Sequence, residues 1–151
     1  MRAVVQRASR AKVVVEGEVV GSIDRGLLVY LGVDREDDDT DLEWLLGKVM
    51  GLRIFEDDEG RMNLSVREVD GELLVISQFT LFGNLRKGTR PSFNRAAEPA
   101  FAEKTYQCFL ERAGQEMGRP AQAGCFGASM EVDAINDGPV TIVIDSKDKR
   151  F

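Results

Sequence analysis

The chain has 151 residues, 43% of them hydrophobic and 30% charged, which predicts one soluble globular domain over residues 1–151. It contains no histidine, which excludes Ser-His-Asp and Cys-His catalysis and any zinc site that includes histidine. The net charge of −6 argues against a general nucleic-acid binder, because clustered Lys and Arg are needed to neutralise phosphates.

The first third of the chain is predicted to form strands. Residues 4–8 and 12–15 alternate in polarity, and a turn at 16–18 leads into a further strand over 19–23. The run 27–33 is continuously apolar and has the length of a strand, so we expect it to be buried on both faces.

A first helix is predicted over residues 41–50, after a polar, acidic loop over 34–39. Thr40 and Glu43 have the spacing of a capping box, in which a hydroxyl and a carboxylate satisfy free backbone N–H groups. Four apolar residues then recur at helical spacing and predict one buried stripe: Leu42, Leu45, Leu46 and Val49.

The middle of the chain combines short strands with loops. We expect a strand over 53–55 and a turn over 57–60, whose acidic residues lack the ligand spacing of a calcium-binding EF-hand. A second apolar run over 73–79 becomes polar at its end, and residues 83–93 are predicted to form a long loop.

The last third predicts one helix and two strands. Pro99 begins an amphipathic helix that Gly118 ends, and strands over 130–135 and 140–145 flank a predicted turn at 136–139. This order predicts an α+β fold, with mostly antiparallel β-sheets in a sandwich or barrel-like core and two main helices packed outside.

Neither an export signal nor a membrane span is indicated. No stretch approaches the roughly 18 consecutive apolar residues of a transmembrane helix. The first residues lack the apolar segment of a signal peptide, so we expect a cytoplasmic protein with no membrane contact. In that reducing compartment, Cys108 and Cys125 are expected to be free, semi-buried thiols.

Two segments could bind a substrate. Ser77, Gln78 and Thr80 follow a buried strand, where a rigid scaffold often positions binding groups, although the two hydroxyls could equally cap their own backbone. The pattern around Gly138-Pro139 is typical of a turn, with a trans peptide bond as the ordinary expectation.

Several motifs, in order along nearly the whole chain, match one known family. They are Gln6-Arg7, Gly26-Leu27-Leu28-Val29, Arg53-Ile54-Phe55, Met62-Asn63-Leu64, Ser77-Gln78-Phe79-Thr80-Leu81, Arg90-Pro91-Ser92-Phe93 and Asn136-Asp137-Gly138-Pro139-Val140-Thr141. With these motifs the chain resembles the D-aminoacyl-tRNA deacylases. The resemblance implies a homodimer that binds the 3′ end of aminoacyl-tRNA and hydrolyses the ester of a D-amino acid, or of glycine, without a cofactor or a metal.

The resemblance also implies how L-substrates are rejected. In the family the Gly-Pro bond is cis and enters the partner subunit's pocket, so Gly138 and Pro139 would form a wall with parallel carbonyl groups. An L side chain would collide with that wall, whereas a D side chain would point to free space.

For the chemistry, Thr80 is the obvious nucleophile, but no histidine can act as its base. We expect instead that water attacks with help from the 2′-hydroxyl of the terminal adenosine, as is favoured for the family. The N–H groups near Phe79 and Thr80 would stabilise the oxyanion, while Ser77 and Gln78 shape the pocket and Phe79 packs beside the adenosine.

The basic residues after this motif, Arg86, Lys87 and Arg90, are predicted to contact phosphates of the acceptor stem. The principal alternative is a non-catalytic module that binds the tRNA acceptor end. A small-molecule esterase is disfavoured because the chain lacks a G-x-S-x-G motif and histidine.

Overall fold

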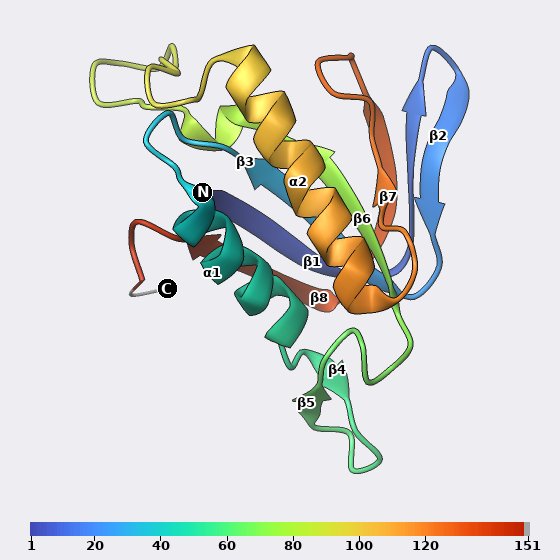
Figure 1. The fold of residues 1–151 in the computed structure, drawn as a ribbon. Helices are drawn as coiled ribbons and strands as arrows, with labels where there is room; N and C mark the ends of the chain where they lie inside the picture. Colours follow the sequence, from blue (N-terminus) through green and yellow to red (C-terminus); the bar gives the residue numbers. More distant parts are fainter. Residues whose placement is uncertain (150–151) are drawn as a thin grey trace.

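The computed structural model describes residues 1–149 and shows a curved, mixed sheet with two helices on one face (Figure 1). The sheet contains β1 (Arg2–Val15), β2 (Glu18–Ile23), β3 (Gly26–Gly32), β6 (Glu72–Ser77), β7 (Gln122–Ala123) and β8 (Glu131–Asp145). The helices are α1 (Asp39–Gly51) and α2 (Pro99–Met117), and a 3₁₀ turn, η1 (Phe79–Phe82), follows β6. A separate hairpin consists of β4 (Phe55–Glu56) and β5 (Met62–Leu64).

The long strand β1 organises the sheet. One of its edges pairs with β8 along nearly its whole length, and the other pairs first with β3 and then with β2, all antiparallel. β3, β6 and β7 continue the sheet in parallel. The sheet curls until it nearly closes as a barrel, and its end strands β2 and β7 come so close that a Cβ on Gly21 would lie 2.5 Å from the carbonyl oxygen of Ala123. The predicted α+β fold with two outer helices is confirmed.

Three strand predictions need correction. Residues 4–8 and 12–15 belong to one strand, because β1 continues between them and changes its partner. The predicted strand over 53–55 begins only at Phe55. The predicted turn at 136–139 is wrong, since this segment stays within β8 as a bulge that remains paired with β1 on either side.

The helix predictions are confirmed, with one change at the start of α1. Its cap is Asp38 rather than Thr40, and the Asp38 carboxylate accepts from the N–H of Thr40 and of Asp41. Asp41 completes the capping box by accepting from the N–H of Asp38, because it occupies the third helical position. α2 begins at Pro99 and ends at Gly118, whose φ of 67° is a left-handed cap.

Both faces of β3 are buried, as its continuous apolar run predicts. Leu27, Val29 and Leu31 pack into the larger core between the sheet and the two helices. Leu28 points the other way, into a smaller core enclosed by the curled sheet. The rigid strands β3 and β6 therefore fix the position of the segments that follow them.

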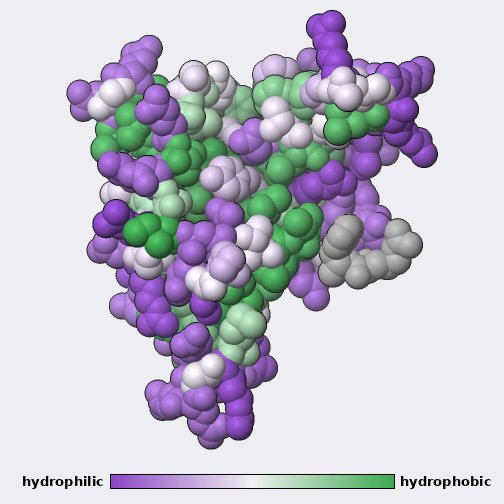
Figure 2. All heavy atoms as spheres, turned by 180° about the vertical axis from the view of Figure 1, so that it is seen from behind, coloured by the Kyte–Doolittle hydropathy of each residue, from purple (hydrophilic) through white to green (hydrophobic). Residues whose placement is uncertain are grey.

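The face turned away from α1 and α2 carries patches of hydrophobic side chains among hydrophilic ones (Figure 2). Exposed large hydrophobic residues on the strands include Val19, Val20, Ile135 and Val143. β8 is a sheet edge that pairs with β1 alone, so part of this surface is bordered by unpaired strand backbone. None of the helices within residues 1–149 is long and apolar enough to cross a membrane.

Candidate active site

A cavity of about 500 Å³ lies beside the end of β6, where Ser77, Gln78 and Phe79 form part of its wall. The opposite wall comes from the 96–102 segment at the start of α2 and from residues 126–132. Three predicted site residues thus line one cavity. They lie next to one another because β6 ends and η1 begins at this point.

The lining of the cavity is mainly apolar. Besides the three motif residues it comprises Leu31, Val33, Ile76, Ala96, Ala97, Pro99, Ala102, Tyr106, Phe126, Gly127, Ala128, Met130 and Val132. No carboxylate, lysine or histidine occurs in this lining. An apolar cavity with a few polar groups at one side is typical of small-ligand sites.

Tyr106 is the one side chain of this lining that can ionise. It is buried, and its hydroxyl donates a hydrogen bond to the carbonyl oxygen of Val75 at 2.8 Å. Burial raises the pKa of Tyr106 to about 12, so the phenol keeps its proton near neutral pH. The cavity therefore contains no side chain that could act as a general base there.

Polar groups at the cavity's edge come from the start of η1. Phe79 and Thr80 are the first two residues of this 3₁₀ turn, and their N–H groups have no acceptor within it. The Gln78 side-chain amide donates to the Thr80 hydroxyl, which thereby acts as an acceptor. Two backbone donors beside an apolar cavity can stabilise a developing negative charge on oxygen.

Thr80 itself is exposed and does not line the cavity. Phe79 is 58% exposed, and its ring meets Phe93 edge-on with centroids 5.0 Å apart. This contact connects η1 to the long loop over 83–93, which is further held by a pair of hydrogen bonds between Asn84 and Ser92. Phe93 was part of a family motif, but its pairing with Phe79 was not predicted.

Gly138 and Pro139 lie outside the cavity of their own chain. They are exposed in the bulge of β8, and the peptide bond between them is cis, in agreement with the family resemblance. Four residues of β8, 137–140, stand opposite the single residue Arg7 of β1.

Arg7 is buried beneath this bulge and fixes it from within the sheet. Its guanidinium donates to the carbonyl oxygens of Ile54 at 2.7 Å and Asp137 at 3.2 Å, and it pairs with the Asp137 carboxylate. Asn136 holds the other side of the bulge by accepting from the N–H of Val140. Sequence reasoning gave Arg7 only as a family match, because its partners are far away in the chain.

Arg86, Lys87 and Arg90 are exposed in the loop that follows η1. They are near the motif in sequence but are not part of the cavity wall. A second hollow of about 570 Å³ is polar, with Arg10, Lys12 and Asp133 in its lining, and it contains none of the predicted site residues. Within residues 1–149, no cluster of three His, Cys, Asp or Glu residues could hold a metal.

Comparison with protein families found a match that covers almost the whole chain. The profile of the family described as D-Tyr-tRNA(Tyr) deacylase matches residues 4–145. The chain is 60% identical to the D-aminoacyl-tRNA deacylase of Opitutus terrae over 146 residues, which is 97% of each chain. It is 56% identical to that of Thermotoga petrophila, again over 97% of each chain.

Solved structures with the same fold also cover almost the whole chain. The c-Myc DNA unwinding element binding protein superposes with a TM-score of 0.92 at 42% identity, over 96% of this chain and 98% of that one. A probable eukaryotic D-amino acid tRNA deacylase superposes with a TM-score of 0.81 over 95% and 97% of the two chains. At 19% identity, the second likeness concerns the fold alone.

Proposed function

Because this chain belongs to the D-Tyr-tRNA(Tyr) deacylase family, we propose that it hydrolyses the ester bond of D-aminoacyl-tRNA and releases free tRNA and a D-amino acid. The observation that carries the proposal is the joint position of Ser77, Gln78 and Phe79 on an apolar cavity beside two backbone donors. The amino acid and the terminal adenosine would occupy this cavity and its rim.

The proposed reaction uses water rather than an enzyme nucleophile. The water oxygen attacks the ester carbonyl carbon, and the N–H groups of Phe79 and Thr80 stabilise the negative charge on the carbonyl oxygen. The bond to the 3′-oxygen then breaks, and that oxygen leaves with a proton. Since the cavity lining offers no base, the 2′-hydroxyl of the terminal adenosine is the group that orients the water and passes a proton from that water to the leaving 3′-oxygen.

Selection against L-substrates is proposed to come from a second subunit. Gly138 and Pro139 are exposed and do not line their own cavity, which is compatible with insertion into a partner's cavity. Exposed Ile135 and Val143 on the same edge strand offer apolar surface for such a dimer. Glycine has no side chain for the wall to reject, so glycine carried on tRNA is proposed as a further substrate.

Contacts with the tRNA body are proposed for Arg86, Lys87 and Arg90. Their side chains are exposed on the loop that follows η1, and phosphate contacts of this kind position a nucleic acid without reading its sequence. Charged tRNA occurs in the cytoplasm, which is the proposed compartment.

The deciding experiment compares D-Tyr-tRNA, L-Tyr-tRNA and Gly-tRNA at catalytic amounts of the purified protein. We expect many turnovers on D-Tyr-tRNA and Gly-tRNA and little cleavage of L-Tyr-tRNA. Equal rates on the D and L forms would refute the chiral wall. Binding without turnover would instead identify a non-catalytic acceptor-end module, and a stable, active monomer in sedimentation would refute the shared site.

A further inference from the structure

Phe82, the last residue of η1, is held between two arginines. It is buried, and the guanidinium carbon of Arg2 lies 5.2 Å from its ring centroid while that of Arg95 lies 5.6 Å away. Both distances fall within the range of a cation–π contact. The ring fits against β3 because Gly32 has no side chain, and a Cβ there would come within 3.0 Å of the ring.

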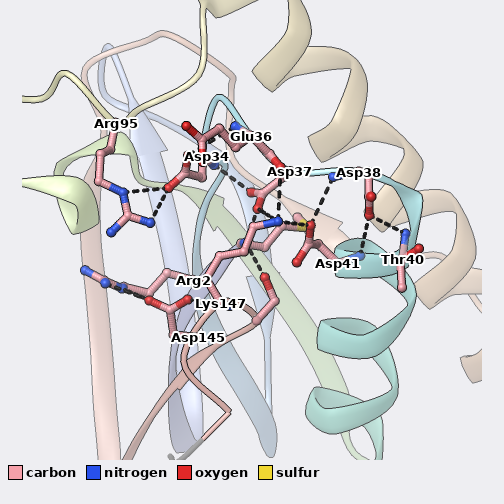
Figure 3. A network of polar contacts seen from close by, with 12 residues as sticks. Arg2, Asp34, Glu36, Asp37, Asp38, Thr40, Asp41, Arg95, Asp145 and Lys147 are labelled. Carbon is pink, nitrogen blue, oxygen red and sulfur yellow. Dashed lines mark hydrogen bonds and ion pairs between the residues drawn. The ribbon is translucent and has the colours of Figure 1, made fainter.

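Each arginine is itself fixed by a buried carboxylate, as Figure 3 shows. Arg2 donates from Nε and Nη2 to the same oxygen of Asp145, Oδ2, at 2.9 and 2.6 Å, and Arg95 donates to Oδ2 of Asp34 in the same way and at the same two distances. The Asp145 and Asp34 side chains are 4% and 2% exposed. Two charge-assisted N–H bonds from one guanidinium to a buried carboxylate oxygen restrict the orientation of that guanidinium. We call Arg2, Arg95, Asp34 and Asp145 the guanidinium clamp.

The clamp is also joined to backbone that adjoins two parts of the cavity lining. Arg2 donates to the carbonyl oxygen of Leu81 within η1 at 2.7 Å. On the other side, the carbonyl oxygen of Arg95 accepts from the N–H of Arg35. The next residues, Ala96 and Ala97, line the cavity, and the N–H of Ala97 donates to the carbonyl oxygen of Val33.

We propose that the guanidinium clamp positions η1 against the 95–97 segment, so that Arg2 and Arg95 are positioning residues for ester hydrolysis. The inference rests on the proposed function, since its kinetic consequence concerns the N–H groups of Phe79 and Thr80. Oxyanion donors contribute only when they point at the place where charge develops, and a misplacement of about 1 Å costs about 100-fold in rate. Neither arginine lines the cavity, so they act through η1.

The test uses Arg95→Ala and Arg95→Lys, with Arg2→Lys as a second site. Lysine keeps the positive charge near Phe82 but lacks the rigid, planar set of N–H donors that orients a guanidinium on the carboxylate. Arg112→Ala is the matched control, because its side chain is as exposed as that of Arg2, at 29%, and also pairs with carboxylates, yet it bridges α2 to Asp39 and Glu43 away from η1.

Two measurements are made on each variant. With D-Tyr-tRNA, we expect kcat to fall about 10-fold to 100-fold in Arg95→Ala and less in Arg95→Lys, with KM changed by less than about twofold. Independently of substrate, amide hydrogen exchange should accelerate at Leu81 and Gly83, whose N–H groups close the η1 turn on Gln78 and Thr80. Arg112→Ala should change neither quantity.

The outcomes separate the clamp from the proposed function. Unchanged kcat and unchanged exchange in the Arg95 variants would overturn the inference. A raised KM with unchanged kcat would also overturn the inference, because it would indicate that Arg95 contacts the tRNA rather than positions η1. If the native protein cleaves no D-Tyr-tRNA, the proposed function fails, and the exchange rates at Leu81 and Gly83 still decide whether the clamp holds η1. Should Arg2→Lys fail to fold, both Arg95 variants suffice.

Discussion

Replacing Thr80 by alanine or valine separates two accounts of the chemistry. The hydroxyl is exposed, and its one interaction among the described side chains is the hydrogen bond that it accepts from Gln78. Both substitutions remove this hydroxyl and leave the backbone N–H of residue 80 in place. The variants therefore test a nucleophile without disturbing the proposed oxyanion donors.

If Thr80 only accepts a hydrogen bond, its replacement should slow the reaction far less than if Thr80 is the nucleophile, and the two expected rate losses differ by orders of magnitude. A hydrogen bond of this kind contributes about 0.5–1.5 kcal/mol net, which corresponds to a loss in rate of about 2-fold to 13-fold. Loss of a covalent nucleophile costs far more, with about 10⁶-fold seen for a serine hydrolase. We expect the smaller effect, because the cavity lining provides no base that could activate Thr80.

The assay is single-turnover cleavage of D-Tyr-tRNA with enzyme in excess, which reports the chemical step. Thr80→Val is the stricter variant, since valine keeps the shape of threonine, and Thr80→Ser is the control that retains a hydroxyl. A loss above about 10⁴-fold in both Thr80→Ala and Thr80→Val, with unfolding unchanged and Thr80→Ser active, would refute the reasoning.

Three further predictions concern stability. Tyr106→Phe removes one of the two hydrogen bonds that the carbonyl oxygen of Val75 accepts, while that from the N–H of Gly124 stays, so urea denaturation should show a loss of about 0.5–1.5 kcal/mol. Gly26→Ala would place a Cβ 2.0 Å from the carbonyl oxygen of Glu72, so the β3–β6 pairing should open and the Tm should fall steeply; an unchanged Tm would contradict the packing. Burial alone would raise the pKa of Asp41, but hydrogen bonds led by that from Lys147 lower it to about 2. Because this pKa is depressed in the folded state, the Asp41 carboxylate stabilises the fold fully above about pH 4, and this stabilisation is lost as the pH falls towards 2. Lys147→Met should weaken that acid dependence in denaturation curves, and an unaltered pH profile would argue against the ion pair.

Local signals were sufficient for much of the fold. Pro99 and Gly118 mark the two ends of α2 as predicted, because a proline without an N–H suits the start of a helix and a glycine with a positive φ suits its end. The apolar run over 27–33 correctly predicted a strand buried on both faces. The prediction at Thr40 was off by two residues, since Asp38 and Asp41 form the capping box instead.

The sequence by itself also determined the family. It also indicated that Ser77, Gln78 and Phe79 lie together on the cavity lining, because these residues are contiguous at the end of β6. Only the tertiary structure decided that 136–139 is a bulge rather than a turn. That outcome depends on the pairing of β8 with β1, in which the 137–140 bulge stands opposite Arg7.

The guanidinium clamp was likewise beyond the reach of sequence reasoning. Arg2 and Asp145 are separated by 143 positions, and Asp34 and Arg95 by 61, so nothing in a local pattern connects them. Each pair forms because the closing sheet brings remote strand ends and loops to the same edge, next to Phe82. Periodicity and turn chemistry act over a few residues, whereas the site's position and its supports depend on which distant segments share a surface.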